Sequence, residues 1–176
     1  MEITIRRADA ADLDAVARIY EHVHDAEEAG PAQVGWIRGV YPVRSTAEAA
    51  LERGDLFVEE ADGAVVGTGI FNRLQADVYA GAPWQYDAPD DQIMVLHTLA
   101  VDPQAGKRGL GRAFAAFYEQ YAREQGCRYL RIDTNAKNAN ARRFYAGLSY
   151  REIAVRPCTF NGIGIVDLVL LEKKLD

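Results

Sequence analysis

The stretch of sequence that decides the predicted fold covers residues 93–133 and reads IMVLHTLAVDPQAGKRGLGRAFAAFYEQYAREQGCRYLRID. It opens with Ile93–Val101, an almost continuous apolar run that is typical of a central strand buried on both faces. Apolar residues then recur at helical spacing, and a second strand follows at Tyr129–Asp133. The helical positions are Leu110, Phe114, Phe117 and Tyr121, and the helix stops at Gly126. Strand, helix and strand in this order predict a βαβ unit within a mixed α/β fold.

The rest of the chain predicts shorter elements. Asp62-Gly63 is a strong hairpin signal between two strands, and Asp9 is the expected N-cap of the first helix. The expected elements are a strand around Ile3 and Ile5, a helix from Asp9 to about Ala29, a helix from the capping-box pattern Ser45 and Glu48 to Gly54, strands at Leu56–Glu60 and Ala64–Phe71, a helix at Asn138–Gly147, strands near Tyr150–Arg156 and Ile163–Leu171, and irregular stretches at 30–43 and 72–91.

Length and composition predict one globular domain over residues 1–176, because the chain is 49% apolar and 26% charged. The net charge of -6 argues against a nucleic-acid-binding protein. Cys127 and Cys158 form neither a disulfide framework nor a metal-binding spacing, and His22 and His24 lie on different faces of the expected helix. We therefore expect no metal. The chain shows no signal-peptide pattern and no stretch of membrane-spanning length, so the expected location is the cytoplasm, without a membrane partner.

The loop after the central strand, residues 102–113, combines glycines with basic residues at the start of a helix. Gly106, Gly109 and Gly111 allow a ligand to approach the backbone closely, and free N–H groups at a helix N-terminus attract anions. This pattern predicts a phosphate or pyrophosphate site, with a plain turn carrying solvated basic residues as the alternative. The spacing matches neither a P-loop nor a dinucleotide-binding fingerprint, because Val101 and Phe114 occupy positions where those motifs need small residues.

Within this stretch, Leu99-Ala100-Val101 followed by Arg108-Gly109-Leu110-Gly111-Arg112-Ala113 resembles the GNAT superfamily of acetyl-CoA-dependent N-acetyltransferases. Gly106 stands where that family usually has Gln or Arg. The resemblance implies a central, mixed and mostly antiparallel sheet of about seven strands, flanked by helices on both faces. It also implies acetyl-CoA as co-substrate, and no metal. The residues expected to bind acetyl-CoA are Leu99, Ala100, Val101, Gly106, Lys107, Arg108, Gly109, Leu110, Gly111, Arg112, Asn135, Asn138 and Ala141.

The resemblance continues through Asn138-x-x-Ala141-x-x-x-Tyr145 and ends at Leu148-Ser149-Tyr150, where Ser149 replaces the usual glycine. Tyr145 matches the position of the family's general acid. A phenol with a pKa near 10 is suited to protonate a leaving thiolate whose thiol has a pKa of roughly 8 to 9. The alternative is an aromatic side chain that only packs in the core.

The central strand offers two further catalytic candidates. Backbone N–H groups near Leu99 and Val101 would polarise a thioester carbonyl if the strand bulges or splays there, as in the family that the chain resembles. His97 would share their face in a regular strand and could accept an ammonium proton directly or through water. The alternative for His97 is a hydrogen-bonded core histidine.

The acceptor is expected to bind the N-terminal half, through Trp36, Tyr41, Trp84 and Tyr86 in the two irregular stretches. Nearby acids, Asp87, Asp90 and Asp91, suit a cationic amine, although a solvated loop is the other reading. No histidine neighbours Cys127 in sequence, so a covalent acetyl-enzyme is disfavoured.

The predicted function is transfer of an acetyl group from acetyl-CoA to a primary amine of a small molecule, by direct attack in a ternary complex. The alternatives are a protein or peptide N-acetyltransferase and a non-catalytic acyl-CoA-binding sensor. A homodimer through the C-terminal strands is left open. Residues 1–105 hold 19 acidic and 7 basic residues, net -12, and residues 106–176 hold 7 and 13, net +6. This asymmetry fits an anionic donor on the C-terminal half and a cationic acceptor on the N-terminal half.

Overall fold

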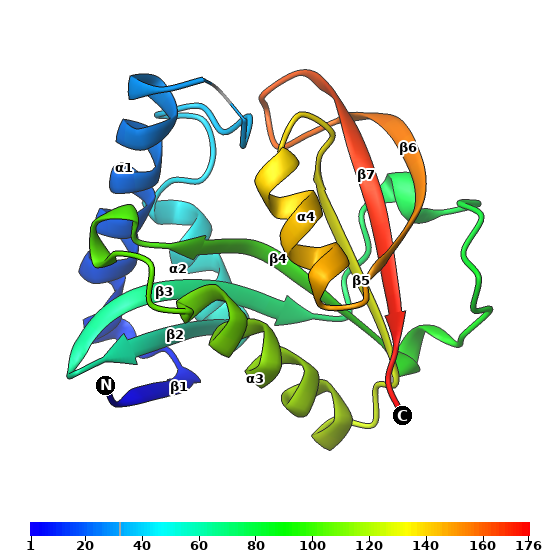
Figure 1. The fold of residues 1–176 in the computed structure, drawn as a ribbon, viewed down its shortest axis with the longest axis horizontal. Coiled ribbons are helices and arrows are strands. Elements are labelled where there is room, and N and C mark those ends of the chain that lie inside the picture. The colour runs from blue at the N-terminus through cyan, green and yellow to red at the C-terminus, as the bar shows by residue number, and fades with distance from the viewer. Residues whose placement is uncertain (32) are drawn as a thin grey trace.

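The computed structural model describes residues 1–31 and 33–176, and one seven-stranded sheet runs through it (Figure 1). The order is β1-β2-β3-β4-β5-β7-β6. β4 and β5 are parallel, and every other neighbouring pair is antiparallel. This confirms the predicted mixed, mostly antiparallel sheet. The strands are β1 (Ile3–Arg7), β2 (Leu56–Ala61), β3 (Ala64–Asn72), β4 (Ile93–Val101), β5 (Tyr129–Asn135), β6 (Arg151–Thr159) and β7 (Ile165–Lys174).

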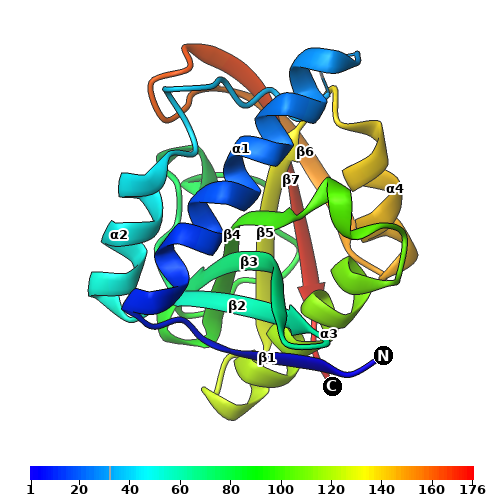
Figure 2. The same cartoon turned by 90° about the vertical axis from the view of Figure 1, so that its left-hand side faces the viewer.

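Two pairs of helices cover the two faces of the sheet (Figure 2). α1 (Leu13–Ala29) and α2 (Arg44–Arg53) pack on one face, around a buried cluster that includes Ile19, Leu56 and Ile70. α3 (Leu110–Glu124) and α4 (Ala139–Gly147) pack on the other, where Phe114 and Tyr145 join the largest cluster. The predicted helical stripe of α3 and its βαβ connection between β4 and β5 are confirmed.

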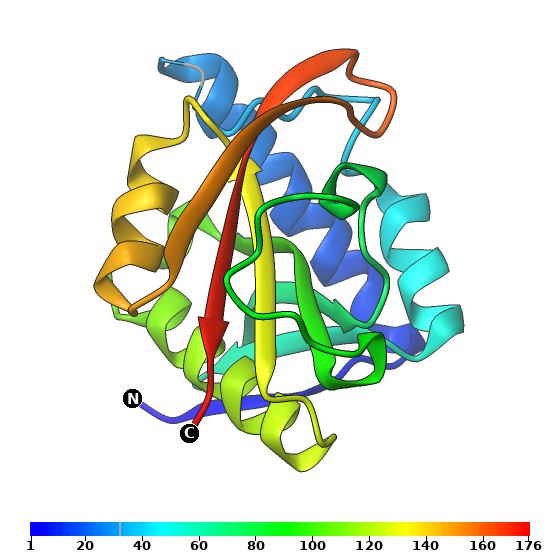
Figure 3. The same cartoon turned by 90° about the vertical axis from the view of Figure 1, so that its right-hand side faces the viewer.

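The segment between β3 and β4 is irregular, as predicted, and contains only the short 3-10 turns η2 (Asp77–Tyr79) and η3 (Asp90–Gln92). It folds over the sheet on the side that α1 and α2 also occupy (Figure 3). Tyr79 is the buried centre of this cover, and it packs with Ile93, Val95, Leu168 and Leu170. The segment therefore shields β4, β5 and β7 from solvent.

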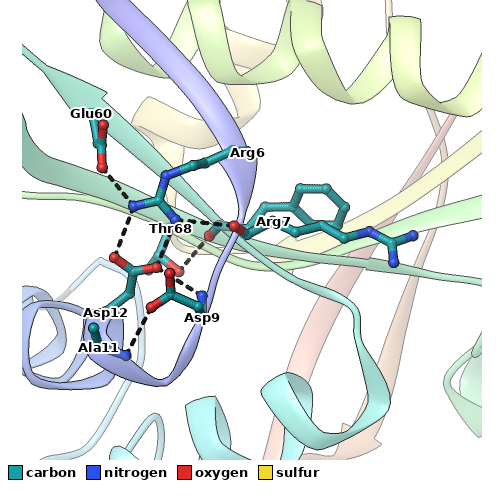
Figure 4. Close-up of polar contacts among 8 residues, drawn as sticks. Arg6, Arg7, Asp9, Ala11, Asp12, Glu60 and Thr68 are labelled. Atoms are coloured by element: carbon teal, nitrogen blue, oxygen red, sulfur yellow. Dashed lines mark hydrogen bonds and ion pairs between the residues drawn. The ribbon is translucent and has the colours of Figure 1, made fainter.

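Charged side chains fix the connection between β1 and α1 (Figure 4). Asp9 caps the 3-10 turn η1 (Ala10–Asp12), accepting from the Ala11 amide at 2.8 Å, while Asp12 accepts from the Asp9 amide at 2.8 Å. Arg6 bridges Asp12 at 2.8 Å and Glu60 of β2 at 2.6 Å. The predicted cap is thus confirmed, with a 3-10 turn before the α-helix proper.

The predicted capping box of α2 is wrong. The helix begins at Arg44, and Thr46 Oγ1 accepts from the amide of Val43 at 3.1 Å. Glu48 instead pairs with Arg44 at 3.0 Å, one helical turn away. The predicted end at Gly54 is confirmed, because this glycine adopts the left-handed conformation with φ of 79°.

Candidate active site

The central feature of the site is a wedge between β4 and β5. These strands pair only through Ile93–Leu96 and Tyr129–Ile132, and beyond that point β4 follows β3 while β5 follows β7. Thr98 and Leu99 have no register partner in either neighbouring strand. Separation of the two strands exposes the second half of β4 to a ligand.

A bulge at Thr98 accompanies the wedge. Ile70 pairs with His97 and Thr68 with Ala100, so β4 gains a residue relative to β3. Thr98 has φ of 51°, an unusual value for a β-branched residue. Its hydroxyl contacts the Tyr41 hydroxyl from the loop between α1 and α2. The sequence-based expectation that β4 bulges or splays near Leu99 is therefore met in both respects.

The wedge opens into a cavity of about 680 Å³. β4, β5 and α4 line the side where the sequence predicts the acetyl donor, here called the donor side. The other side, here called the acceptor side, is lined by α1, the segment after it, residues 74–77 and the turn between β6 and β7. His97, Leu99, Ala100, Val101, Asn135, Asn138, Ala141, Tyr145, Trp36 and Tyr41, all predicted site residues, line this one cavity. Residues more than 100 positions apart in the chain are thus brought together.

Tyr145 lies at the buried end of α4, where its side chain reaches the cavity and is 5% exposed. Its ring packs edge-on against Phe144 at 5.1 Å and Tyr150 at 5.5 Å, which fixes its direction. Burial, followed by the nearby charge of Asp133, raises the pKa of the phenol above its usual range. The hydroxyl therefore keeps its proton at neutral pH and can donate it to a developing thiolate.

The loop between β4 and α3 forms an open cradle of backbone amides. Gly106 and Gly109 have φ of 81° and 74°, and α3 starts directly after Gly109. Among the described residues, none accepts a hydrogen bond from the amides of residues 106–112. Lys107, Arg108 and Arg112 are exposed around them. Free amides, a helix N-terminus and three cations fit a pyrophosphate group.

The residues after β5 support the same side of the cavity. Asn138 caps α4, with Oδ1 accepting from the Ala141 amide at 3.1 Å, as its place in the motif suggests. Asn135 Oδ1 accepts from the Lys137 amide at 2.9 Å. Its amide nitrogen lies against Gly35, where a Cβ atom would come within 2.3 Å of it. Gly35 therefore lets the segment after α1 approach β5 closely.

His97 lines the cavity, but the predicted face is wrong. The bulge at Thr98 interrupts strand alternation, so His97 shares a face with Ala100 instead of Leu99. Nε2 of His97 lies 2.7 Å from Oδ1 of Asn72, whose amide group donates to Asp55 at 3.0 Å. Burial lowers the pKa of His97 to about 4, although the charge of Asp55 opposes this. The imidazole is neutral at physiological pH.

The four predicted acceptor residues divide into two pairs. Trp36 and Tyr41 line the cavity, and Tyr41 packs edge-on against Trp36 at 6.2 Å and Phe160 at 5.6 Å. Trp84 and Tyr86 do not line it, which corrects the prediction for this pair. Trp84 covers the guanidinium of Arg131 at 4.0 Å because that buried cation needs a partner, and Tyr86 packs on Tyr129. The exposed Asp87, Asp90 and Asp91 also lie outside the lining.

Two functional candidates went unassigned in the sequence. Asp133, on the part of β5 that pairs with β7 but no longer with β4, lines the cavity and accepts a hydrogen bond from the Tyr79 hydroxyl at 2.6 Å. Thr98 holds the bulge of β4. β5 also contains Arg131, Thr134 and Asn135, so the local sequence pattern does not single out Asp133.

Metal and membrane sites can be assessed for residues 1–31 and 33–176. No cluster of three or more His, Cys, Asp or Glu side chains in this part of the chain is placed to hold a metal ion. Over the same residues, no helix combines the length and apolarity needed to cross a bilayer.

Comparison with known proteins agrees with this geometry. The model of the acetyltransferase (GNAT) family matches residues 16–150. A mycothiol acetyltransferase of Cellulomonas flavigena is 28% identical over 96 residues, which are 54% of this chain but only 26% of that protein. An acetyltransferase of the GNAT family from Streptococcus agalactiae has a TM-score of 0.80 at 21% identity, covering 99% of this chain and 96% of that one. The yncA protein of Salmonella typhimurium, solved with its cofactor acetyl-CoA, has a TM-score of 0.69 at 23% identity, with 100% and 95% covered. The chain, matched by the family model over more than half its length, belongs to the acetyltransferase (GNAT) family.

Proposed function

We propose that this acetyltransferase moves the acetyl group of acetyl-CoA to a primary amine of a small molecule, by direct attack in a ternary complex. The observation that carries the proposal is the wedge, which presents unpaired β4 backbone and the Tyr145 phenol to one cavity. The free amides of residues 106–112 suit the pyrophosphate of acetyl-CoA, and the wedge lies next to them along the chain. The donor thioester and the acceptor amine would meet between β4 and α4.

Different residues assist the separate steps of the proposed reaction. Attack by the amine nitrogen forms the C–N bond at the thioester carbonyl, and backbone N–H groups of the bulged segment near Leu99 stabilise the charge that develops on oxygen. The C–S bond breaks, and Tyr145 donates its proton to the departing sulfur. The phenolate regains a proton from the acylated nitrogen, so Tyr145 ends the reaction as it began. Cys127 is fully buried and Cys158 has a pKa raised by burial, which disfavours either as a nucleophile.

His97 retains a place in the proposal as a neutral side chain. Burial disfavours the protonated, charged form of His97 and lowers its pKa to about 4, so direct removal of an ammonium proton by His97 is disfavoured. Its hydrogen bond to Asn72 favours the structural alternative or a water relay. The acidic limb of the kcat/KM profile for His97→Gln distinguishes these roles, because only a relay changes it.

The aromatic loops on the acceptor side favour a small molecule over a protein. Trp36 and Tyr41 from one loop and Phe160 and Asn161 from the turn between β6 and β7 line the same cavity. A peptide chain would need a groove that leads across the surface. The protein or peptide acetyltransferase remains the second candidate, and a non-catalytic acyl-CoA sensor is the third.

The proposal also includes a cytoplasmic location and a homodimer. The two cysteines are unpaired, which supports a reducing compartment such as the cytoplasm. β6 is an edge strand, and Val155 within it and Ile165 at the start of the neighbouring β7 are 53% and 79% exposed, which supports a homodimer. Light scattering across protein concentration checks the dimer.

The proposal is tested by coenzyme A release, followed with a thiol reagent over small amines, amino acids and peptides, with products identified by mass. Turnover of small amines with intersecting initial-rate lines supports the proposal. Turnover of peptides alone indicates the second candidate, and binding of acetyl-CoA without turnover indicates the sensor. Parallel initial-rate lines would contradict direct attack.

A further inference from the structure

The lining of the cavity carries carboxylates but no cationic side chain among its described residues. Three carboxylates line the cavity, and its described lining residues include neither lysine nor arginine. Glu27 is already occupied, since its oxygens accept from the amides of Gln33 at 2.8 Å and Gly35 at 2.6 Å. Asp77 is exposed at the start of η2. Asp133 is therefore the carboxylate that the interior of the cavity offers to a ligand.

Asp133 lies where the elements of the site meet. It follows Ile132, the last residue of β5 that pairs with β4. Oδ2 accepts from the Tyr79 hydroxyl at 2.6 Å, while Oδ1 accepts no hydrogen bond from the described residues. Its charge raises the pKa of Tyr145 in α4, of Tyr41 in the loop after α1 and of Cys158 in β6. Groups from three separate elements thus lie within its electrostatic reach.

The half-satisfied carboxylate has an energetic consequence. Burial raises the pKa of Asp133 above its usual range, and the Tyr79 hydrogen bond lowers it only in part. The carboxylate is half-buried, and one of its oxygens has no hydrogen-bond partner among the described residues, so its lost hydration is compensated only in part. An ammonium group in the cavity would supply that partner and a proton for it.

The surroundings define the rest of the ligand. Trp36, Tyr41 and Phe160 form an aromatic wall on the acceptor side, with ring pairs in edge contact. Aromatic rings pack well against the apolar part of a ligand, and the faces of the rings attract cations. A carboxylate on the ligand would find no cation in the described lining, and Asp133 would repel it.

We propose that Asp133 binds the acceptor as an ammonium ion through Oδ1 and accepts its proton, and that the acceptor is an apolar amine without a carboxylate beside the nitrogen. This inference rests on the proposed function. The proton passes from nitrogen to Oδ1, leaving a neutral amine with its electron pair free for attack and a carboxylic acid that solvent later deprotonates. Tyr79 is a positioning residue, because its hydroxyl holds Oδ2 and turns Oδ1 to the cavity.

The test uses the full-length protein with acetyl-CoA and three acceptors. Phenethylamine is a cation with an apolar body, phenylalanine adds a carboxylate to the same skeleton, and aniline is uncharged at neutral pH. Asp133→Asn keeps the shape and the Tyr79 contact but removes the charge. Asp87→Asn removes one charge from an exposed position outside the cavity and is the matched control.

The wild-type enzyme should prefer phenethylamine to phenylalanine by at least about 10-fold in kcat/KM. Asp133→Asn should lower kcat/KM for phenethylamine by about 10- to 100-fold and affect aniline far less, because hydrogen bonds to charged groups have about this strength. The affinity for coenzyme A, measured by calorimetry, should stay unchanged and reports on folding. Tyr79→Phe should move the acidic limb of kcat/KM to higher pH, because the carboxylate loses a stabilising donor.

Three outcomes would overturn the inference in distinguishable ways. Equal losses for phenethylamine and aniline in Asp133→Asn would remove the ammonium contact but leave the proposed function intact. A wild-type preference for phenylalanine would contradict the acceptor class alone. If the wild-type enzyme acetylates no amine or peptide, the proposed function fails and this inference fails with it.

Discussion

Glu59 provides a quantitative test of how the sheet tolerates a buried charge. The side chain lies in β2 and is fully buried, and neither carboxylate oxygen has a hydrogen-bond partner among the described residues. Gly67 on β3 leaves room for it, since a Cβ atom there would come within 2.7 Å of Oε2. Burial raises the pKa of Glu59 from 4.5 to about 7. A carboxyl group with a raised pKa binds its proton more tightly in the folded state, so it lowers stability as pH rises.

The size of the effect follows from the two pKa values. The interval from 4.5 to 7 corresponds to about 3.4 kcal/mol at pH well above 7, of which about 2.5 kcal/mol develops between pH 5 and 8. Glu59→Gln removes the titration. The free energy of unfolding by urea should therefore change, relative to wild type, by about 2.5 kcal/mol in favour of the variant from pH 5 to pH 8.

Glu52→Gln is the matched control, because Glu52 is exposed on α2. Its difference from wild type should not vary over the same pH range. A difference between Glu59→Gln and wild type that stays constant from pH 5 to 8 would refute the reasoning, because it would show that the buried carboxyl titrates normally.

Three other variants test separate parts of the structure. Burial lowers the pKa of His97 from 6.5 to about 4 in the folded state, so protonation at low pH favours unfolding. As pH falls from 6.5 to 4, the free energy of unfolding of wild type, measured in urea, should drop by up to about 3 kcal/mol relative to His97→Gln. A difference between the two proteins that does not change with pH would contradict the burial of His97. Gly109→Ala should lower the free energy of unfolding by about 1 to 2 kcal/mol and weaken coenzyme A binding, because the backbone of Gly109 has φ of 74°. Gly147→Ala in α4 is the control and should have neither effect. Equal effects of the two variants on coenzyme A binding in calorimetry would contradict the amide cradle. Tyr41→Phe should lower kcat by about 5- to 10-fold at unchanged coenzyme A affinity, since it frees the Thr98 bulge; an unchanged kcat would remove Tyr41 from the site.

The βαβ unit and the donor side of the site could be predicted because their signals are local. The apolar run of β4, the stripe of α3 and the glycines of the loop each carry a pattern that few other structures satisfy. Asn138 caps α4 where the motif places it, and Tyr145 follows it into the cavity.

The acceptor side could be predicted only in part, because it depends on contacts between distant segments. Trp36 and Trp84 look alike in sequence, but the buried Arg131 attracts Trp84 away from the cavity. The face of His97 was predicted from regular alternation, and one residue in the left-handed region, Thr98, reverses it. The proposed role of Asp133 depends on the hydrogen bond that it accepts from Tyr79, which is 54 positions away in the sequence.

The most direct test of the account is a single-turnover measurement of acetyl transfer to phenethylamine by wild type and Tyr145→Phe, with both substrates saturating. The account predicts that the rate of the chemical step falls by about 10²- to 10⁴-fold while the affinity for coenzyme A stays the same, because only the proton donor to the leaving sulfur is lost. Tyr129→Phe, whose hydroxyl lies outside the cavity lining, should keep the wild-type rate. A Tyr145→Phe enzyme that transfers the acetyl group as fast as wild type would contradict the central claim that the phenol in the wedge protonates the departing thiolate.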